Sequence, residues 1–370
     1  MVKIIHVLAG KANPNTMNGV NKVVDALANE QLVLGFDVMV VGIANNTEKR
    51  HDPQYGYYLF KKTGYFTYPK DALSLLLMQS DENSVFHFHS VFIPWFLPLI
   101  NDLKRNNRKH IFLTPHGQYV TEAMKRSMMK RIFFNLFDKK VIRSVEAVHV
   151  IGCETENNSY LRNNAKRIVT IPNGYSCESK SLDDICPSFV IGYLGRLECG
   201  QKGLDVLLPA FVKYHRIGGK AQLNIAGLGI HEQLLKKMVS EFKASNYIHF
   251  IGKVYDEEKW SFIKGCAAMI TPSRWDGVPT SCLEAASARR PQLVTASTNL
   301  GPYITKYNAG LVIAEANEDD IVKMLLDFDE IYSDSKRYEL MCDGARKMIV
   351  EELNWHNIAA KMVKELYEIQ

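Results

Sequence analysis

The chain has 370 residues, of which 46% are hydrophobic and 23% are charged, so wholesale disorder, collagen and long coiled coil are excluded. Its seven cysteines include no Cys-x-x-Cys pair, which argues against a disulfide framework or a zinc site and favours a reducing compartment. No stretch approaches the ~20 apolar residues that a membrane-spanning helix needs, and at roughly 150 residues per domain the length predicts two or three domains.

The net charge of +5 is unevenly distributed along the chain. Residues 1–178 carry 22 lysines and arginines against 15 acidic residues, a net charge of +7, whereas residues 179–370 carry 23 against 25, a net charge of −2. This excess predicts that the N-terminal half meets an anionic partner such as lipid headgroups or nucleic acid. A random distribution of surface charge is the alternative.

Short apolar runs alternate with helical patterns through the first half of the chain. Residues 3–8 predict a buried strand rather than the core of a signal peptide. Apolar residues at helical spacing predict a helix over residues 20–34, which Gly35 ends. Further strands are predicted at residues 37–41, 84–89, 110–114, 147–151 and 168–171. Strands joined by helical crossovers predict a parallel, doubly wound sheet.

The same alternation restarts after a polar stretch at residues 175–187, which predicts an interdomain linker. Strands are predicted at residues 189–194, 221–226, 248–251, 267–271 and 292–295, and helices at residues 204–214, 231–243, 257–264 and 280–289. The predicted fold class is therefore α/β, with two Rossmann-like doubly wound domains in tandem. Such domains would bind a ligand in the cleft between them, at the carboxyl ends of both sheets.

The segment Thr271-Pro-Ser-Arg-Trp-Asp-Gly-Val-Pro-Thr-Ser-Cys-Leu-Glu-Ala-Ala-Ser287 carries the clearest chemical pattern. A buried strand is followed by a loop with an acid and a glycine, and a helix is predicted to begin near Thr280. The backbone N–H groups present between residues 277 and 281 would be free there and would form an anion site. Asp276 and Glu284 would flank this site, because helical side chains lean toward the N-terminus. The alternative is that Asp276 caps the helix and that Glu284 is a solvated surface charge.

This acid-x7-acid segment resembles the Glu-x7-Glu element of the retaining glycosyltransferases of family 4, with Asp276 in place of the first glutamate. Other segments resemble motifs of that family in the same order: Asn18-Gly-Val20, Thr114-Pro-His-Gly117, Ile171-Pro-Asn-Gly174, Ile191-Gly-Tyr-Leu-Gly-Arg-Leu-Glu198 and Gln201-Lys-Gly-Leu-Asp-Val-Leu-Leu208. The resemblance covers essentially the whole chain and implies the two-domain GT-B fold. It implies an acceptor-binding domain of residues 1–176 plus 355–370, to which the final amphipathic helix returns, and a nucleotide-sugar-binding domain of residues 177–354.

The resemblance also implies roles for individual residues. Arg196 and Lys202 would contact the diphosphate of a nucleotide sugar, whose charge grows as it leaves. Glu284 would accept hydrogen bonds from the ribose, and Asp276 from the transferred sugar. His116 would contact the donor sugar near its anomeric carbon, although a histidine at a strand end is also often structural.

The expected catalytic residues are His116, Asp276, Arg196 and Lys202, and the expected donor-binding residues are Gly19, Arg196, Lys202, Asp276, Gly277, Val278, Pro279, Thr280 and Glu284. No Asp-x-Asp metal element stands beside a strand end. The resemblance implies that neither a metal nor a cofactor is needed, because cations and helix N-termini replace the metal.

His87 and His89 alternate in one predicted strand and share one of its faces. A metal pair is conceivable there. A structural role is the alternative that we favour, because no third ligand is evident in the sequence.

The resemblance further implies transfer with retention. No carboxylate stands at the position of His116 to act as a nucleophile, so front-face substitution is favoured over a covalent intermediate. The segment Asp276-Gly-Val-Pro279 resembles the Glu-Gly-Phe-Pro variant of the family, which we associate with UDP-hexose or UDP-N-acetylhexosamine donors; GDP-mannose is the alternative.

The segment of residues 124–143 combines seven lysines and arginines with methionine, isoleucine, leucine and phenylalanine. A basic helix with such an apolar face suits an anionic membrane surface. The expected acceptor is then a saccharide or lipid-linked saccharide in surface polysaccharide synthesis, with no nucleic acid partner. The expected location is the cytoplasm or the inner face of the plasma membrane. The alternative is that the phenylalanines pack on the sheet and the cations are merely solvated.

Two other functions remain open from the sequence. A catalytically inactive scaffold that binds a nucleotide sugar is suggested by Asp276, where the family has glutamate. A nucleotide-sugar epimerase on the same fold is the other, and the acid-x7-acid element argues against it.

Overall fold

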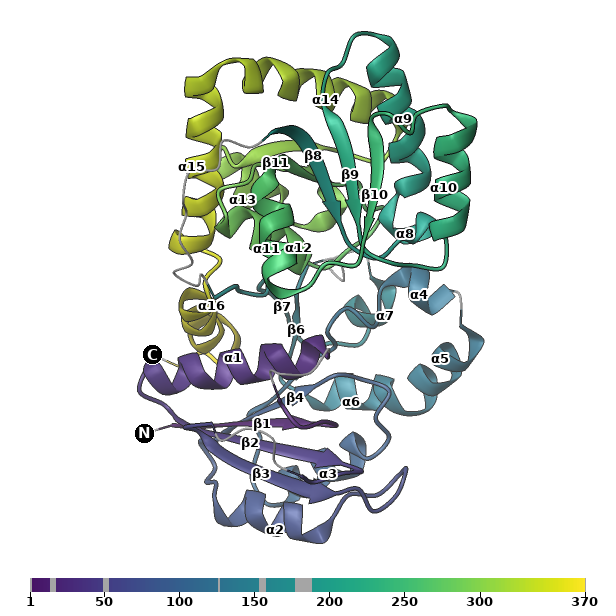
Figure 1. Ribbon diagram of the computed structural model, residues 1–370. Helices are drawn as coiled ribbons and strands as arrows, with labels where there is room; N and C mark the ends of the chain where they lie inside the picture. Colours follow the sequence, from purple (N-terminus) through teal and green to yellow (C-terminus); the bar gives the residue numbers. More distant parts are fainter. Residues whose placement is uncertain are drawn as a thin grey trace. The chain divides into compact units, whose positions relative to one another are not determined.

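The computed structural model describes residues 2–13, 18–48, 53–125, 127–152, 158–176 and 188–369. The chain divides into two compact units (Figure 1). Unit 1 consists of Met1–Asn173 and Trp355–Gln370, and unit 2 consists of Gly174–Asn354. Of the predicted linker, residues 177–187 lie outside the described residues.

Unit 1 is built on a seven-stranded parallel sheet in the order β3-β2-β1-β4-β5-β6-β7. Its strands are β1 (Lys3–Leu8), β2 (Asp37–Ala44), β3 (Gly56–Lys61), β4 (Val85–His89), β5 (Ile111–Thr114), β6 (Ala147–Val150) and β7 (Ile168–Thr170). The central strands are buried on both faces, which is why they appear in the sequence as continuous apolar runs. The strand order reverses between β1 and β4, and ligands of doubly wound sheets bind outside the carboxyl ends of strands at such a point.

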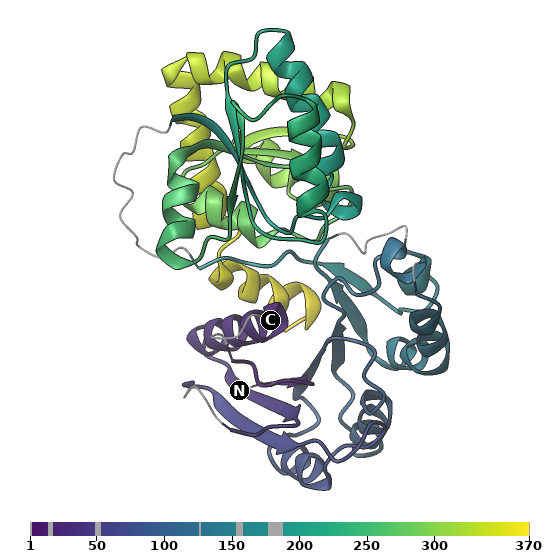
Figure 2. The ribbon, with the colours of Figure 1, turned by 45° about the vertical axis from the view of Figure 1, so that its right-hand side comes forward.

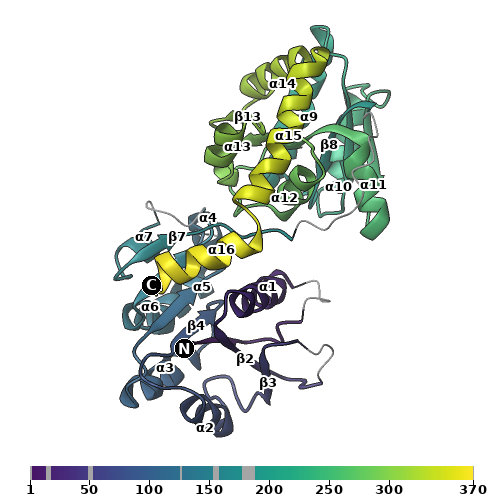
Figure 3. The same cartoon turned by 90° about the vertical axis from the view of Figure 1, so that its left-hand side faces the viewer.

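The helices of unit 1 cover both faces of this sheet. They are α1 (Gly19–Val33), α2 (Lys70–Met78), α3 (Phe96–Arg105), α4 (Thr121–Lys125), α5 (Met128–Phe133), α6 (Lys139–Ser144), α7 (Ser159–Arg162) and α16 (Trp355–Lys361). Asn18 caps α1 by accepting a hydrogen bond from the Val20 N–H, and Gly35 follows the helix with a positive φ of 90°. The final helix α16 lies against α1 (Figure 3).

Unit 2 is built on a six-stranded parallel sheet in the order β10-β9-β8-β11-β12-β13. Its strands are β8 (Ser188–Leu194), β9 (Gln222–Ala226), β10 (Ile248–Gly252), β11 (Cys266–Thr271), β12 (Gln292–Thr295) and β13 (Gly310–Ile313). Its helices are α8 (Cys199–Lys202), α9 (Leu204–Arg216), α10 (Glu232–Glu241), α11 (Asp256–Gly265), α12 (Thr280–Ser287), α13 (Gly301–Tyr307), α14 (Glu318–Ser333) and α15 (Ser335–Glu351). Figure 2 shows helices on both sides of the fan of strands in this unit.

The prediction of two doubly wound parallel sheets is confirmed. Apart from the basic segment of residues 124–143, the predicted strands and helices exist, with ends that differ by a few residues. Two strands, β3 and β13, were not predicted; each lies at one edge of its sheet and is only partly buried.

The basic segment of residues 124–143 is not the single helix that the sequence predicted. It consists of the end of α4, then α5, a π-helical turn over Phe134–Asp138, and α6. Arg126, one of its cations, lies outside the described residues. The C-terminal helix also changes character, since α16 runs into a π-helical turn over Met362–Leu366. Within the described residues, no helix is long and apolar enough to cross a membrane.

Candidate functional site

Two loops of unit 2 are joined where β8 and β11 end. The loop after β11 donates a backbone hydrogen bond from Arg274 to the Gln201 carbonyl at 2.8 Å, and the Gln201 side chain donates to the Trp275 carbonyl at 3.2 Å. The Arg274 guanidinium binds both carboxylate oxygens of Asp205 at 2.8 Å each. This bidentate pair joins the loop after β11 to α9 and so fixes the short helix α8 between them.

Gly203 allows this close approach. It adopts a φ of 70°, and a Cβ atom there would lie 2.0 Å from the Pro272 carbonyl oxygen. Only a residue without a side chain fits, because both the backbone conformation and the space require glycine. Lys202, the last residue of α8, is thereby held beside the loop after β11.

The structure pairs two residues that the sequence analysis assigned to separate roles. The Lys202 ammonium donates a hydrogen bond to the Asp276 carboxylate, and both side chains are largely buried, with 13% and 15% exposed. Asp276 also accepts a hydrogen bond from the Ser273 hydroxyl at 3.2 Å. Its backbone is fixed as well, since its N–H donates to the Ser297 carbonyl and its carbonyl accepts from the Asn299 amide.

Glu284 has a cationic partner that the sequence analysis missed. Lys259 of α11 donates to Glu284 Oε1 at 2.8 Å. No local pattern links these residues, because they belong to different helices separated by β11. The sequence left Glu284 as either a ribose ligand or a solvated surface charge. In the structure its carboxylate is mostly buried and ion-paired.

The start of α12 lies between these two carboxylates in the sequence, and the structure begins this helix at Thr280, as predicted. Pro279 stands at the N-cap position, and no side chain caps the helix. The first-turn N–H groups of such a helix favour an anion. Val278 and Pro279, two of the expected donor-binding residues, have buried side chains. Backbone groups, including that of the half-buried Gly277, are what this turn offers instead.

Arg196 follows β8 by two residues and is exposed. Its guanidinium donates to the neutral Gln201 side chain at 2.9 Å. The positive charge of Arg196 therefore lies at the same pair of loops as Lys202, on an exposed side chain.

In unit 1, His116 lies two residues beyond β5 in a strained backbone conformation. His116 and Gly117 have φ angles of 54° and 77°. A non-glycine residue in this region is uncommon, and such strain clusters at functional sites. The ring is half-buried, and burial lowers the pKa of His116 to about 3, so the imidazole is neutral at physiological pH.

His87 and His89, considered above as a pair of metal ligands, lie beside a third histidine, His6, that the sequence did not reveal. Nitrogen atoms of His6, His87 and His89 lie within 4.8 Å of one another, and all three side chains are buried. However, the ring nitrogens of all three already have hydrogen-bond partners in the protein. This saturation favours a hydrogen-bonded network over a cation site.

Gly19, one of the expected donor-binding residues, is the first residue of α1. A Cβ atom there would meet nothing within 4 Å, so packing does not require glycine at this position.

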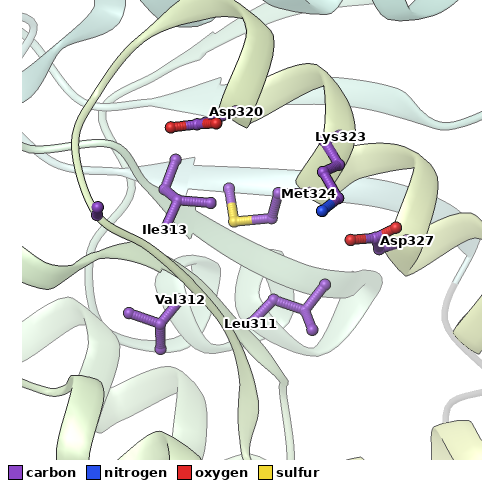
Figure 4. Close-up of a pocket in the computed structure, with 8 residues that line it drawn as sticks. Leu311, Val312, Ile313, Asp320, Lys323, Met324 and Asp327 are labelled. Carbon is purple, nitrogen blue, oxygen red and sulfur yellow. The ribbon is translucent and has the colours of Figure 1, made fainter.

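A pocket of about 320 Å³ lies elsewhere in unit 2, between β13 and α14 (Figure 4). It is lined by Leu311, Val312, Ile313, Ala314, Asp320, Lys323, Met324 and Asp327. None of the expected site residues lines it.

Comparison with known proteins identifies the family of both halves of the chain. Residues 17–179 match the family described as Glycosyltransferase Family 4, and residues 186–362 match the family described as Glycosyl transferases group 1. An uncharacterized glycosyltransferase of Methanocaldococcus jannaschii is 27% identical over 183 residues, which is 49% of this chain. The match spans 45% of the length of that relative.

Two solved structures share the fold along the whole chain. Sucrose-phosphate synthase from Thermosynechococcus elongatus has a TM-score of 0.69 at 16% identity, covering 99% of this chain and 98% of that one. HepE from Anabaena, in complex with UDP and glucose, has a TM-score of 0.68 at 13% identity. The match covers 100% of this chain and 100% of that one. The chain therefore belongs to the glycosyltransferases of the GT-B fold, with a family 4 domain followed by a group 1 domain.

Proposed function

We propose that this chain is a retaining glycosyltransferase that moves a hexose or N-acetylhexosamine from a UDP-linked donor to a saccharide or lipid-linked saccharide. The observation that supports this most is the surroundings of α12. Its uncapped N-terminus is flanked by two lysine–carboxylate pairs, Lys202 with Asp276 and Lys259 with Glu284.

Each group has a use in holding a nucleotide sugar. The first-turn N–H groups of α12, Lys202 and Arg196 would bind the diphosphate and stabilise its charge as it leaves. Glu284 would accept hydrogen bonds from the ribose hydroxyls, and Asp276 from the transferred sugar. The lysine partners hold both carboxylates in position, so each carboxylate needs only to exchange one partner when the donor binds.

We propose that transfer proceeds by front-face substitution. The bond from the anomeric carbon to the phosphate oxygen breaks, and the acceptor oxygen bonds to the same face of the sugar. The acceptor proton passes to the leaving phosphate oxygen. His116 would contact the transferred sugar, and no metal ion is required in this proposal because cationic side chains and N–H groups compensate the charge.

The deciding experiment is a donor screen with the purified chain. Thermal-shift measurements with UDP-, GDP- and ADP-sugars identify the nucleotide, and transfer assays with saccharide acceptors follow in the presence of EDTA. We expect UDP-sugar turnover that survives EDTA, with a product whose anomeric configuration by NMR equals that of the donor. Nucleotide binding without turnover would favour the inactive scaffold, and inverted product would refute retention.

A basic, apolar surface on unit 1 supports a membrane-bound acceptor. Four large apolar side chains are exposed between α5 and the π-helical turn: Met128, Met129, Ile132 and Leu136. Exposed cations accompany them at Lys125, Arg131 and Lys140, while Phe134 is buried. Cations around exposed apolar side chains suit an anionic lipid surface, to which each near-surface lysine or arginine contributes about 1 kcal/mol.

We therefore propose peripheral binding to the inner face of the plasma membrane, where a lipid-linked saccharide would be extended during surface polysaccharide synthesis. Lys125→Glu, Lys130→Glu and Arg131→Glu together should abolish binding to anionic liposomes. The matched control reverses three exposed lysines of unit 2, Lys237, Lys253 and Lys347, and should leave binding intact. Salt should mimic the effect, because the screening length is about 3 Å at 1 M. Wild-type protein that ignores anionic liposomes at low salt would refute membrane binding.

A further inference from the structure

Unit 1 contains a continuous chain of hydrogen bonds through five histidines. They come from β1, β4 and β6 and from the residues after β5: His6, His87, His89, His149 and His116. Three other side chains link them: Thr114 at the end of β5, Gln31 in α1 and Tyr367 near the C-terminus. All are fully buried or nearly so except the half-buried His116, which the proposed function places at the donor sugar.

The first part of the chain runs from a backbone carbonyl to Tyr367. His149 Nε2 lies 2.7 Å from the Ile171 carbonyl oxygen, and His149 Nδ1 lies 2.8 Å from the Thr114 hydroxyl. The same hydroxyl lies 2.6 Å from His87 Nε2. His87 Nδ1 in turn lies 2.8 Å from the Tyr367 hydroxyl.

The second part runs from Tyr367 to His116. The Gln31 amide nitrogen donates to the Tyr367 hydroxyl at 3.4 Å, and Gln31 Oε1 lies 2.7 Å from His6 Nε2. His6 Nδ1 lies 2.8 Å from His89 Nε2. His89 Nδ1 lies 3.1 Å from His116 Nε2, where the chain ends.

The Ile171 carbonyl fixes the direction of the first part. A carbonyl only accepts, so His149 must donate through Nε2–H, and burial lowers the pKa of His149 to about 4, which leaves Nδ1 without a proton. Nδ1 then accepts from the Thr114 hydroxyl, whose oxygen must accept from His87 Nε2–H. Burial holds the pKa of His87 well below its ordinary value, so its Nδ1 accepts from the Tyr367 hydroxyl.

The same reasoning carries the direction to His116. Because the Tyr367 proton points to His87, its oxygen accepts from the Gln31 NH₂ group, and Gln31 presents its carbonyl oxygen to His6. His6 therefore donates through Nε2–H and accepts at Nδ1 from His89. His89 accepts at its own Nδ1 from His116. The flipped Gln31 amide is excluded, because its carbonyl oxygen would then face the Tyr367 oxygen, whose single proton is donated to His87 Nδ1.

We propose that this chain holds His116 in the Nε2–H tautomer, with its Nδ1 lone pair presented as an acceptor to a hydroxyl group of a sugar substrate. Thr114, Gln31 and Tyr367 are the positioning residues. The substrate half rests on the proposed function, whereas the tautomer half rests on unit 1 alone. A lone pair attracts a hydroxyl and repels a phosphate oxygen, so His116 recognises the sugar and not the diphosphate.

The tautomers can be measured directly in the ligand-free protein. With ¹⁵N-labelled histidine, two-bond ¹H–¹⁵N spectra distinguish a protonated from an unprotonated ring nitrogen. We expect the Nε2–H form for all five histidines at neutral pH. His116→Gln, at the end of the chain, assigns the His116 signal without breaking the other bonds. A His116 signal with a proton on Nδ1, or on both nitrogens, overturns the proposal.

Tyr367→Phe tests the link between the two parts. Without the hydroxyl, Gln31 is free to flip, so His6, His89 and His116 should become mixtures of tautomers. His149 and His87 should keep theirs, because the Ile171 carbonyl and Thr114 still orient them. The control is Tyr338→Phe in unit 2. This change likewise removes a buried tyrosine hydroxyl that donates a hydrogen bond, in this case to the Ala267 carbonyl. An unchanged His116 signal in Tyr367→Phe would contradict the proposed coupling.

A metal ion at His6, His87 and His89 is the competing explanation of the cluster. Such an ion would replace hydrogen bonds of the chain and would appear as stoichiometric metal in mass spectrometry of the untagged protein. That result would overturn the proposal, and metal-free protein with the expected tautomers supports it.

Turnover separates the two halves of the proposal. Tyr367→Phe should lower kcat roughly fivefold, the equivalent of one neutral hydrogen bond, with a smaller effect on the donor KM. Scrambled tautomers with unchanged kcat would refute the substrate contact. Wild-type protein without turnover on any donor would refute the proposed function and leave the tautomer result standing.

Discussion

Lys202 donates a hydrogen bond to the carboxylate of Asp276 from the last residue of a four-residue helix, across a turn that only glycine permits. The ion pair is largely buried. Solvent therefore screens it less than a surface pair, and its burial costs desolvation free energy. In the proposed function, its position beside the start of α12 would let both partners contact the anionic donor when it binds.

Removal of the lysine should therefore reduce turnover. Lys202→Met keeps the length of the side chain and removes the charge that would stabilise the leaving diphosphate. We expect kcat to fall by about 10²-fold or more, as is typical for the loss of one preorganised electrostatic donor. Lys213→Met is the control, since Lys213 pairs with Asp319 on the exposed surface of the same unit. Wild-type kcat in the Lys202 variant would remove this residue from the site.

The carboxylate of Glu284 should decide nucleotide affinity. Glu284→Gln leaves the shape unchanged but accepts weaker hydrogen bonds, so UDP binding should weaken by about 1.5–3 kcal/mol. Isothermal titration with UDP measures the change. Glu339→Gln is the control, because this carboxylate pairs with Arg289 at the surface. Lys259→Met should alter UDP affinity less than Glu284→Gln; an unchanged dissociation constant in Glu284→Gln would rule out the ribose contact.

Prediction from sequence succeeded where a local pattern carried the information. The central strands are continuous apolar runs, and the acid, glycine and helix start around Asp276 stand together in the chain, so both were found. The pairs that complete the site are between distant segments: Lys259 with Glu284, and Arg274 with Asp205. Nothing in the spacing of these residues distinguishes them from ordinary surface charges.

The histidine chain was missed for the same reason. The alternation of His87 and His89 revealed a shared face of one strand, but strand order decides which other side chains meet there. β1 and β6 bring His6 and His149 into contact range, and the returning C-terminal segment brings Tyr367. These are properties of the assembled sheet.

Gly203 should be more sensitive to substitution than a glycine that has a positive φ but open space around it. Gly203→Ala adds a methyl group that collides with the Pro272 carbonyl, in addition to the backbone penalty of about 1–2 kcal/mol. Gly218→Ala is the matched control, because Gly218 has a φ of 104° and a Cβ there would meet nothing within 4 Å. Thermal unfolding should show a larger loss of stability for Gly203→Ala, together with loss of turnover as Lys202 is displaced. Equal losses in the two variants would contradict the close-approach argument.

Acid should destabilise unit 1 before unit 2. Burial lowers the pKa of His6 to about 4 and that of His116 to about 3, whereas an unfolded chain protonates histidine near 6.5. The unfolded state then binds more protons, so stability present above about pH 6.5 is lost as the pH falls, by up to about 1.4 kcal/mol per pH unit for each such histidine. Hydrogen exchange should show falling protection in β1 and β4 between neutral pH and about pH 4.5. β8 and β11, which carry no histidine, are the internal control. Equal loss in both sheets would argue against this origin.

Asp276, where the chain departs from the Glu-x7-Glu pattern, gives the sharpest test of an active site against an inactive scaffold. A scaffold is indifferent to the carboxylate, whereas an enzyme needs it at the transferred sugar. Asp276→Asn should lower turnover by roughly 10²-fold through lost positioning, while UDP binding stays nearly intact because the contact is to the sugar.

Asp276→Glu separates charge from reach. The loop cannot retreat to accommodate a longer side chain, because the Asp276 backbone is bonded on both sides, to the Ser297 carbonyl and the Asn299 amide. The extra methylene must therefore push against Lys202 or into the space of the sugar, and kcat should fall although the charge is preserved. Glu82→Asp, a change of carboxylate reach at an exposed residue of unit 1, is the control and should have no effect. Full activity in Asp276→Asn would exclude Asp276 from the site. Full activity in Asp276→Glu would show that the shorter side chain of aspartate is not needed to position the transferred sugar.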